Sequence, residues 1–153
     1  MFETPFTVVG TIVTNPVRLR FGEQELYKFR VASNSRRRTP QGTWEPGNSL
    51  YVTVNCWGNL ATGASASLTK GDAVVVVGHV YTSEYEDKEG VRRSSVEVRA
   101  TAVGPDLSRC TAKVSPLPKP NAVAEPEPAG TVDDADIQAD TEPLDGEALP
   151  LTA

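Results

Sequence analysis

The segment LYVTVNCW, residues 50–57, alternates between two kinds of side chain, and this alternation is the strongest constraint on the fold. Successive side chains of an extended strand point to opposite faces, so the segment predicts a strand with one aliphatic face and one aromatic and polar face. The aliphatic face suits a core, whereas the other is poor core material. The two faces hold Val52, Val54 and Cys56, and Tyr51, Thr53, Asn55 and Trp57, respectively.

Four further segments are rich in β-branched residues or alternate in the same way, and each predicts a strand. Gly10 and Gly78 lie inside two of them, and a glycine within a strand is typical of a bulge or a sharp bend. The four segments are residues 6–13, 25–33, 72–85 and 92–103.

Residues 59–72 lie between the third and fourth predicted strands and are rich in Ala, Ser and Leu. Asn59 as a possible N-cap and Gly71 near the end predict a short helix. Five strands with one helix between strands three and four is the order of the OB-fold, an all-β barrel. That class binds oligonucleotides through one face and its loops.

Charge divides the chain into a basic body and an acidic tail. Residues 1–113 hold 14 Lys and Arg against 11 Asp and Glu, whereas residues 114–153 hold 1 against 9. From residue 115 the chain is rich in proline and then in acids, and it cannot bury enough apolar area to offset its ordering entropy. We therefore expect a folded domain over 1–114 and a disordered tail over 115–153.

The N-terminal segment MFETPFTVVG lacks the basic and long apolar regions of a signal peptide. The longest aliphatic run, Ala73 to Val77, is too short to span a membrane. Cys56 and Cys110 have no metal-like or disulfide spacing. These features predict a reducing, cytoplasmic setting, associated with the nucleoid if the partner is DNA, and no membrane partner.

Catalytic groups are not apparent. His79 is the only histidine, so a histidine-based metal site has no second ligand, and no nucleophile or phosphate-loop motif occurs. Asp72 and His79 are interpreted as a turn residue and an ordinary barrel side chain. We expect neither an enzyme nor a bound metal or cofactor.

Aromatic and cationic side chains together indicate a nucleic-acid interface. Stacking on an aromatic ring is tolerant of base identity, and arginines contact phosphates and also stack. The residues of this pattern are Tyr51, Trp57, Trp44, Arg36, Arg37 and Arg38.

Taken singly, these residues allow other interpretations. Tyr51 and Trp57 could lie at a subunit interface or partly in the core. Arg36 to Arg38 could form a solvated loop, and Trp44 could cap the barrel.

Four segments resemble, in order, motifs of the bacterial single-stranded DNA-binding protein family, and together they cover about residues 4–107. They are VVGTIVTNPVRLR (8–20), NCWGNLA (55–61), LTKGDAVVVVGHV (68–80) and EYEDKEGVRRSSVEVRA (84–100). Asn15 stands where the family usually has Asp. The resemblance implies a homotetramer of OB-folds around which the DNA wraps.

The resemblance also implies roles for single residues. Tyr51, Trp57 and Tyr85 occupy positions where the family carries base-stacking aromatics, often tryptophan at 51 and 85. A further family tryptophan falls near Arg36, and Trp44 is the nearest replacement. Tyrosine keeps a π-face of smaller area, so stacking there is expected to be weaker.

Residues 83–95 predict a hairpin arm whose turn is Lys88-Glu89-Gly90, with Gly90 suited to positive φ. Tyr85 projects from the first strand, and the cations Arg92 and Arg93 lie on the return. On the predicted strand 25–33, Lys28 and Arg30 share the face opposite Tyr27, Phe29 and Val31, and they complete the candidate nucleic-acid-binding residues.

Two functions compete at this point. The first is a sequence-tolerant single-stranded DNA binder that serves replication, recombination or repair. The second is an OB-fold interaction scaffold of the primosome type with weak DNA binding. The three aromatics at stacking positions favour the first.

The tail departs from the family pattern. Family tails usually end in an acidic tip closed by a bulky apolar residue, whereas this chain keeps acids over 133–147 and then ends ALPLTA. An apolar anchor usually carries much of an interface's energy. We therefore expect weakened recruitment of replication or repair proteins and a specialised paralogue rather than the housekeeping protein.

Overall fold

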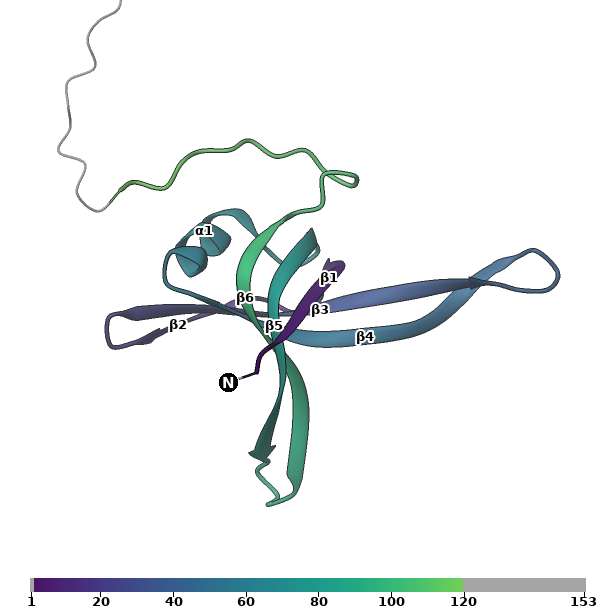
Figure 1. Ribbon diagram of the computed structural model, residues 1–153, viewed down its shortest axis with the longest axis horizontal. Helices are drawn as coiled ribbons and strands as arrows, with labels where there is room; N and C mark the ends of the chain where they lie inside the picture. The colour runs from purple at the N-terminus through teal and green to yellow at the C-terminus, as the bar shows by residue number, and fades with distance from the viewer. Residues whose placement is uncertain (1, 120–153) are drawn as a thin grey trace, which may run out of the picture. The chain divides into compact units, whose positions relative to one another are not determined.

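The computed structural model describes residues 2–119, and these form six strands and one α-helix (Figure 1). The sheet order is β1-β5-β6-β4-β3-β2, and an additional β1–β3 pairing closes five of the strands into a barrel, with β2 outside it at the edge of β3. The OB-fold prediction is confirmed. The elements are β1 (Thr4–Ile12), β2 (Val17–Phe21), β3 (Gln24–Arg38), β4 (Trp44–Trp57), α1 (Asn59–Ser67), β5 (Ala73–Glu86) and β6 (Arg92–Pro105).

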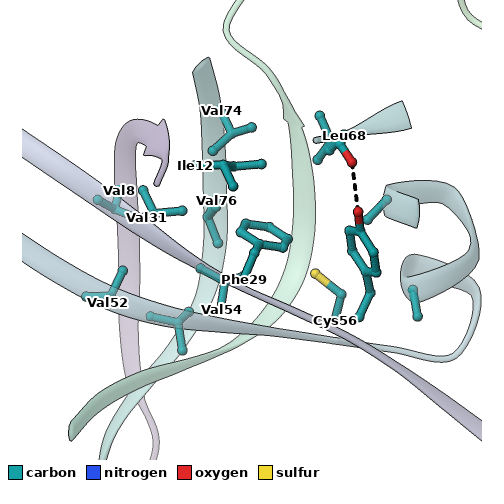
Figure 2. Packing of buried hydrophobic residues seen from close by; sticks show 14 residues of the cluster. Val8, Ile12, Phe29, Val31, Val52, Val54, Cys56, Leu68, Val74 and Val76 are labelled. Atoms are coloured by element: carbon teal, nitrogen blue, oxygen red, sulfur yellow. Dashed lines mark hydrogen bonds between the residues drawn. The ribbon is translucent and has the colours of Figure 1, made fainter. Parts of the chain in front are cut away.

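The barrel core is mostly aliphatic and comes from the inward faces of the five barrel strands, as the alternation predicts (Figure 2). Val52, Val54 and Cys56 of β4 are fully buried. Phe29 lies among valines at the centre, and the Tyr27 hydroxyl donates a 2.8 Å hydrogen bond to the Leu68 carbonyl. Burial is the main cause that raises the pKa of Tyr27. The inward face of β3 thus links the barrel to the end of the helical segment.

Two glycines within strands, Gly10 and Gly78, allow the sheet to close into a barrel. A Cβ at Gly10 would lie 2.4 Å from the Ala32 carbonyl oxygen, where β1 crosses β3. A Cβ at Gly78 would lie 2.1 Å from the Arg99 carbonyl oxygen, beside a register shift between Val77 and Gly78. The predicted bulge is confirmed at Gly78, whereas at Gly10 the structure shows a close approach of two backbones that leaves no room for a Cβ.

The helix is shorter than the composition predicts and begins differently. α1 ends at Ser67, and its N-cap is Gly58 rather than Asn59. Gly58 has a φ of 63°, a conformation that favours glycine, and its N–H donates to the Glu25 carbonyl. Beyond the helix, the Thr69 N–H donates to the Asp72 carboxylate, so Asp72 is a turn residue, as predicted.

Two hairpin arms leave the barrel in different directions (Figure 1). One joins β3 to β4, and the other joins β5 to β6. The run Arg36 to Arg38 lies within β3 and pairs with residues 44–46, so its interpretation as a solvated loop was wrong. The arm has no buried face, and therefore its residues show no apolar period that would mark them as a strand.

The predicted tail is only partly described. The compact unit that contains the barrel ends at Leu117. Residues 115–119 are exposed and irregular, and the rest of the predicted disordered segment lies outside the described residues. Within residues 2–119, no helix has the length and apolarity needed to cross a bilayer.

The two thiols differ in environment and should differ in reactivity. Burial raises the pKa of Cys56 to about 12, whereas Cys110 is exposed. The thiolate is the reactive form. We expect a thiol reagent at pH 8 to modify one cysteine per native chain, Cys110, and both in denaturant. Rapid labelling of Cys56 in the native protein, located by peptide mass spectrometry, would contradict the buried position.

Candidate nucleic-acid interface

Strand register gathers the predicted residues on one side of the sheet. Arg30 pairs with Thr53, and Lys28 pairs with Asn55. Across the other edge of β4, Thr53 and Asn55 pair with residues of β6, which in turn pair with β5. Side chains at paired positions share a face. We call this set the outer face: Lys28, Arg30, Tyr51, Thr53, Asn55, Trp57, His79, Tyr81, Glu97 and Arg99.

The aromatic rings of this surface are accessible. Tyr51 is 49% exposed, and the Arg30 guanidinium lies 5.5 Å from its ring centroid. Trp57 is half-buried. This arrangement places a π-face beside a cation, which is what stacking of a base with a neighbouring phosphate requires.

A polar network lies in the middle of the outer face. Asn55 is buried, and its amide donates to the Tyr81 hydroxyl at 3.2 Å. The Tyr81 hydroxyl donates to the Glu97 carboxylate at 2.9 Å, and Lys28 Nζ lies 3.7 Å from the same carboxylate. Burial, followed by the Glu97 contact, raises the pKa of Tyr81. Lys28 is therefore already partly neutralised by Glu97.

The three consecutive arginines do not form one patch. Residues alternate along β3, so Arg36 and Arg38 share one face of the arm, on which Arg38 is cross-strand from Trp44. Arg37 lies on the other face and forms an ion pair with Glu45. Trp44 is 63% exposed, so it does not cap the barrel. Two cations and one ring therefore face the same side of the arm.

The β5–β6 arm has the predicted turn, and Gly90 has a φ of 77°. Tyr85, 51% exposed, pairs with Arg93, whereas Arg92 pairs with Glu86 and so faces the other way. Asp87 accepts hydrogen bonds from the Glu89 and Val91 amides and pairs with Arg93 at 2.6 Å. The Asp87 carboxylate thus pairs with Arg93, the arginine that lies on the same face of the arm as Tyr85.

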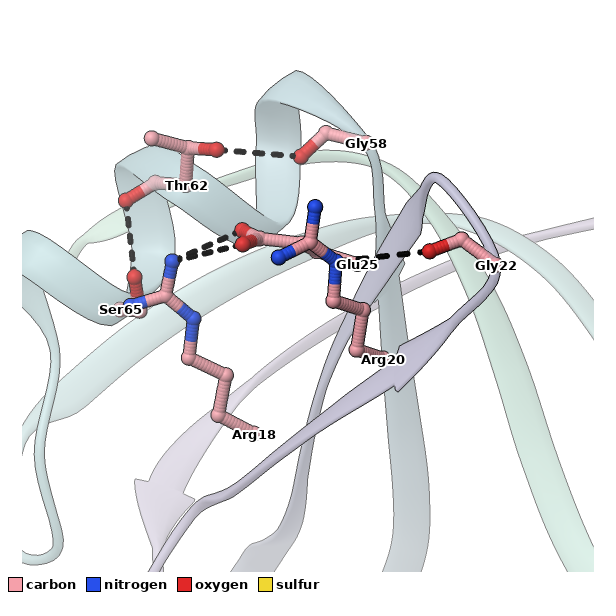
Figure 3. A network of polar contacts seen from close by, with 7 residues as sticks. All are labelled: Arg18, Arg20, Gly22, Glu25, Gly58, Thr62 and Ser65. Atoms are coloured by element: carbon pink, nitrogen blue, oxygen red, sulfur yellow. Dashed lines mark hydrogen bonds and ion pairs between the residues drawn. The ribbon is translucent and has the colours of Figure 1, made fainter.

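One exposed ring was missed by the sequence reasoning. Phe21 is 56% exposed, and its ring centroid lies 5.8 Å from that of Trp57. The residues of β2 alternate apolar and cationic, VRLRF, and this pattern is the signal that could have found the strand. On the other face of β2, Arg18 forms a two-oxygen contact with Glu25 at 2.8 and 2.9 Å (Figure 3).

No group of three or more His, Cys, Asp or Glu side chains that could hold a metal ion occurs among the described residues. His79 Nε2 lies 3.5 Å from a Glu3 carboxylate oxygen and is half-exposed on β5.

Fold and surface define an OB-fold protein whose sheet presents aromatics and cations together. The chain belongs to the single-strand binding protein family, whose model matches residues 4–106.

Relatives agree with this assignment. A single-stranded DNA-binding protein of Corynebacterium glutamicum is 42% identical over 76% of this chain, and one of Streptomyces coelicolor is 40% identical over 74%. The matches cover 53% and 58% of those relatives, so the chain spans little more than half of their length.

Solved structures also resemble it. The second single-stranded DNA-binding protein of Mycobacterium smegmatis is 71% identical, with a TM-score of 0.60 over 75% of this chain and all of that one. A small single-stranded DNA-binding protein of Streptomyces coelicolor is 34% identical, with a TM-score of 0.64 over 72% of this chain and all of that one.

The ion pair between Asp87 and Arg93 predicts that the stability of the β5–β6 turn depends on pH. Arg93 is the main cause that lowers the pKa of Asp87. A lowered folded pKa means that the turn's stabilisation is present above the unfolded value of about 3.9 and is lost as the pH falls through the folded pKa. Carboxyl NMR should show Asp87 titrating below that value, and Arg93→Ala should raise its midpoint. Arg92→Ala is the matched control, and an unchanged midpoint in Arg93→Ala would refute the pairing.

Proposed function

We propose that this chain binds single-stranded DNA without strong sequence preference and protects it in replication, recombination or repair, without catalysis. The observation that carries the proposal is the outer face itself. There the accessible ring of Tyr51 lies under Arg30, and the half-buried Trp57 lies on the same face of the same strand. Membership of the single-strand binding protein family supports the same reading.

Base stacking supplies affinity in this mechanism, and cations follow the backbone. Each base stacked on Tyr51, Trp57 or Tyr85 would contribute roughly 1–3 kcal/mol and would need no particular sequence. Phosphates would reach Arg30, Arg36 and Arg38 first. These three arginines would contribute more to the free energy of DNA binding than cations that are already paired with a carboxylate. A paired cation must lose its contact with the carboxylate before it gains one with a phosphate.

The paired cations form a second group. They and their carboxylate partners are Lys28 with Glu97, Arg37 with Glu45, and Arg93 with Asp87. We propose that these residues, together with Arg92 on the far side of its arm, contribute less to phosphate binding. Trp44 serves as a stacking ring at the end of the β3–β4 arm.

We further propose that the protein acts as a homotetramer in the cytoplasm, on nucleoid DNA. Val9 and Val77 are 45% and 41% exposed on the neighbouring strands β1 and β5, and they supply apolar area for contact with another copy. Light scattering should give the mass of four chains. A monomer at micromolar concentration would contradict the proposal.

A specialised paralogue fits the comparisons better than a housekeeping role, since the solved relative at 71% identity is called the second such protein of its organism. The acidic segment after residue 114 competes electrostatically with DNA for the cations. Removing residues 115–153 should therefore leave affinity unchanged or raise it at low salt.

The scaffold alternative makes a different claim, namely that protein rather than DNA is the main ligand. Exposed rings at 51 and 85 argue against it, because a scaffold has no need of rings at both positions. Tryptophan fluorescence titrated with oligo-dT separates the two functions. Quenching with saturation supports DNA binding, and no change up to millimolar nucleotide would favour the scaffold.

Trp57 provides the direct test of stacking. Trp57→Ala should weaken oligo-dT binding by roughly 1–3 kcal/mol, because a π-face is lost. Trp57→Phe is the matched control and should retain most of the affinity. The measurement is anisotropy of labelled oligo-dT, with circular dichroism to confirm the fold. Equal affinity in a folded Trp57→Ala variant would refute the role of this residue.

The arginine run offers an internal control for the phosphate contacts. For single strands, each lost contact removes about 0.7 from the slope of log K against log salt. Arg36→Ala and Arg38→Ala should each flatten the slope, whereas Arg37→Ala should change it less, since Glu45 already holds Arg37. A flattening by Arg37→Ala as large as that by the other two would show that the alternation is irrelevant to binding.

A further inference from the structure

A pocket of about 630 Å³ opens beside Trp57 at the edge of the outer face. Five parts of the chain line it: the N-terminal segment, the start of β3, the end of β4, and the middle of β5 and of β6. The side chains that matter here are Gln24, Trp57, His79, Tyr81 and Arg99. The pocket is large enough for one nucleotide, since small-ligand sites typically measure about 300–1,000 Å³.

Arg99 is the cation of this pocket. It is exposed, and its strand positions it opposite both Asn55 of β4 and His79 of β5. Within residues 2–119, no ion pair involves Arg99, in contrast to Lys28 with Glu97 on the same face. The nearby acid Glu3 lies against His79 instead, at 3.5 Å. Arg99 is thus available to an incoming anion.

The aromatic side of the pocket extends beyond Trp57. The Phe21 ring, on β2, lies against Trp57 at 5.8 Å with an angle of 46° between the planes. Phe21 pairs across the β2–β3 hairpin with Gln24, which lines the pocket. Phe21 thus adjoins the pocket through Trp57 and Gln24, which line it, and its exposed ring covers no core.

We propose that this pocket receives one nucleotide of the bound strand, with its base against Trp57 and Phe21 and its phosphate on Arg99. The inference rests on the proposed function and adds Phe21 and Arg99 to it as nucleotide contacts, roles that were not assigned to either residue above. A ring pair, one unpaired cation and a neighbouring amide match the three parts of a nucleotide: base face, phosphate and base edge.

The test compares oligo-dT binding by full-length variants. Phe21→Leu keeps the apolar contact with Trp57 but removes the π-face, and it should lower affinity several-fold, as loss of a stacked ring does. Arg99→Ala should flatten the salt slope by about 0.7. Arg20→Ala is the matched control, because Arg20 lies on the opposite face of β2 from Phe21 and does not line the pocket; its slope should equal that of the unaltered protein.

A second readout locates the base. Ultraviolet crosslinking of an oligonucleotide that carries 5-iododeoxyuridine, followed by peptide mass spectrometry, should place a crosslink on Trp57 or Phe21. If Phe21→Leu and Arg99→Ala bind like the unaltered protein while Trp57→Ala does not, the pocket is unused and DNA binding stands. If the unaltered protein fails to bind oligo-dT, the proposed function falls and this inference falls with it.

Discussion

The burial of one face of β4 is the constraint on which the rest depends. Val52, Val54 and Cys56 are fully buried, so a slip of one residue in the register would bring the polar set into the core. The same register fixes where the outward side chains meet those of β3 and β6, and it puts Arg30 over Tyr51 and Lys28 near Glu97. Core packing thus determines the geometry of a surface that it does not touch.

Ion pairing, rather than the number of basic residues, determines which cationic side chains are free to bind an anionic ligand. Lys28, Arg37 and Arg93 each lie against a carboxylate, whereas Arg30 lies over a ring. Exposed ion pairs are individually weak, about 0–1 kcal/mol, so the phosphates of a DNA strand can compete with the carboxylates. Each carboxylate contact that is replaced lowers the net free energy gained on DNA binding. This accounts for how a modestly basic body can hold a localised binding surface.

The sequence predicted the barrel because its strands alternate between core and solvent, and that period is visible residue by residue. It did not predict β2 or the outer part of β3, because neither has a buried face: the alternation of β2 covers only five exposed residues, and Arg36 to Arg38 show no apolar period. Glu97 and Asp87 as partners of cations depend on pairing between distant segments, which no local pattern reports. The sequence did not mark Arg99 as a binding residue for the same reason. Its place in the pocket depends on Trp57 and His79, which come from other strands of the sheet.

We propose the outer face as the surface that meets single-stranded DNA. The most direct measurement is the map of backbone and indole NMR shifts on addition of oligo-dT to the labelled protein. We expect large changes at Arg30, Tyr51, Trp57 and Arg99 and smaller ones along α1, none of whose residues belongs to the outer face. Changes confined to α1 and the strand ends beside it, with the Trp57 indole unmoved, would contradict it.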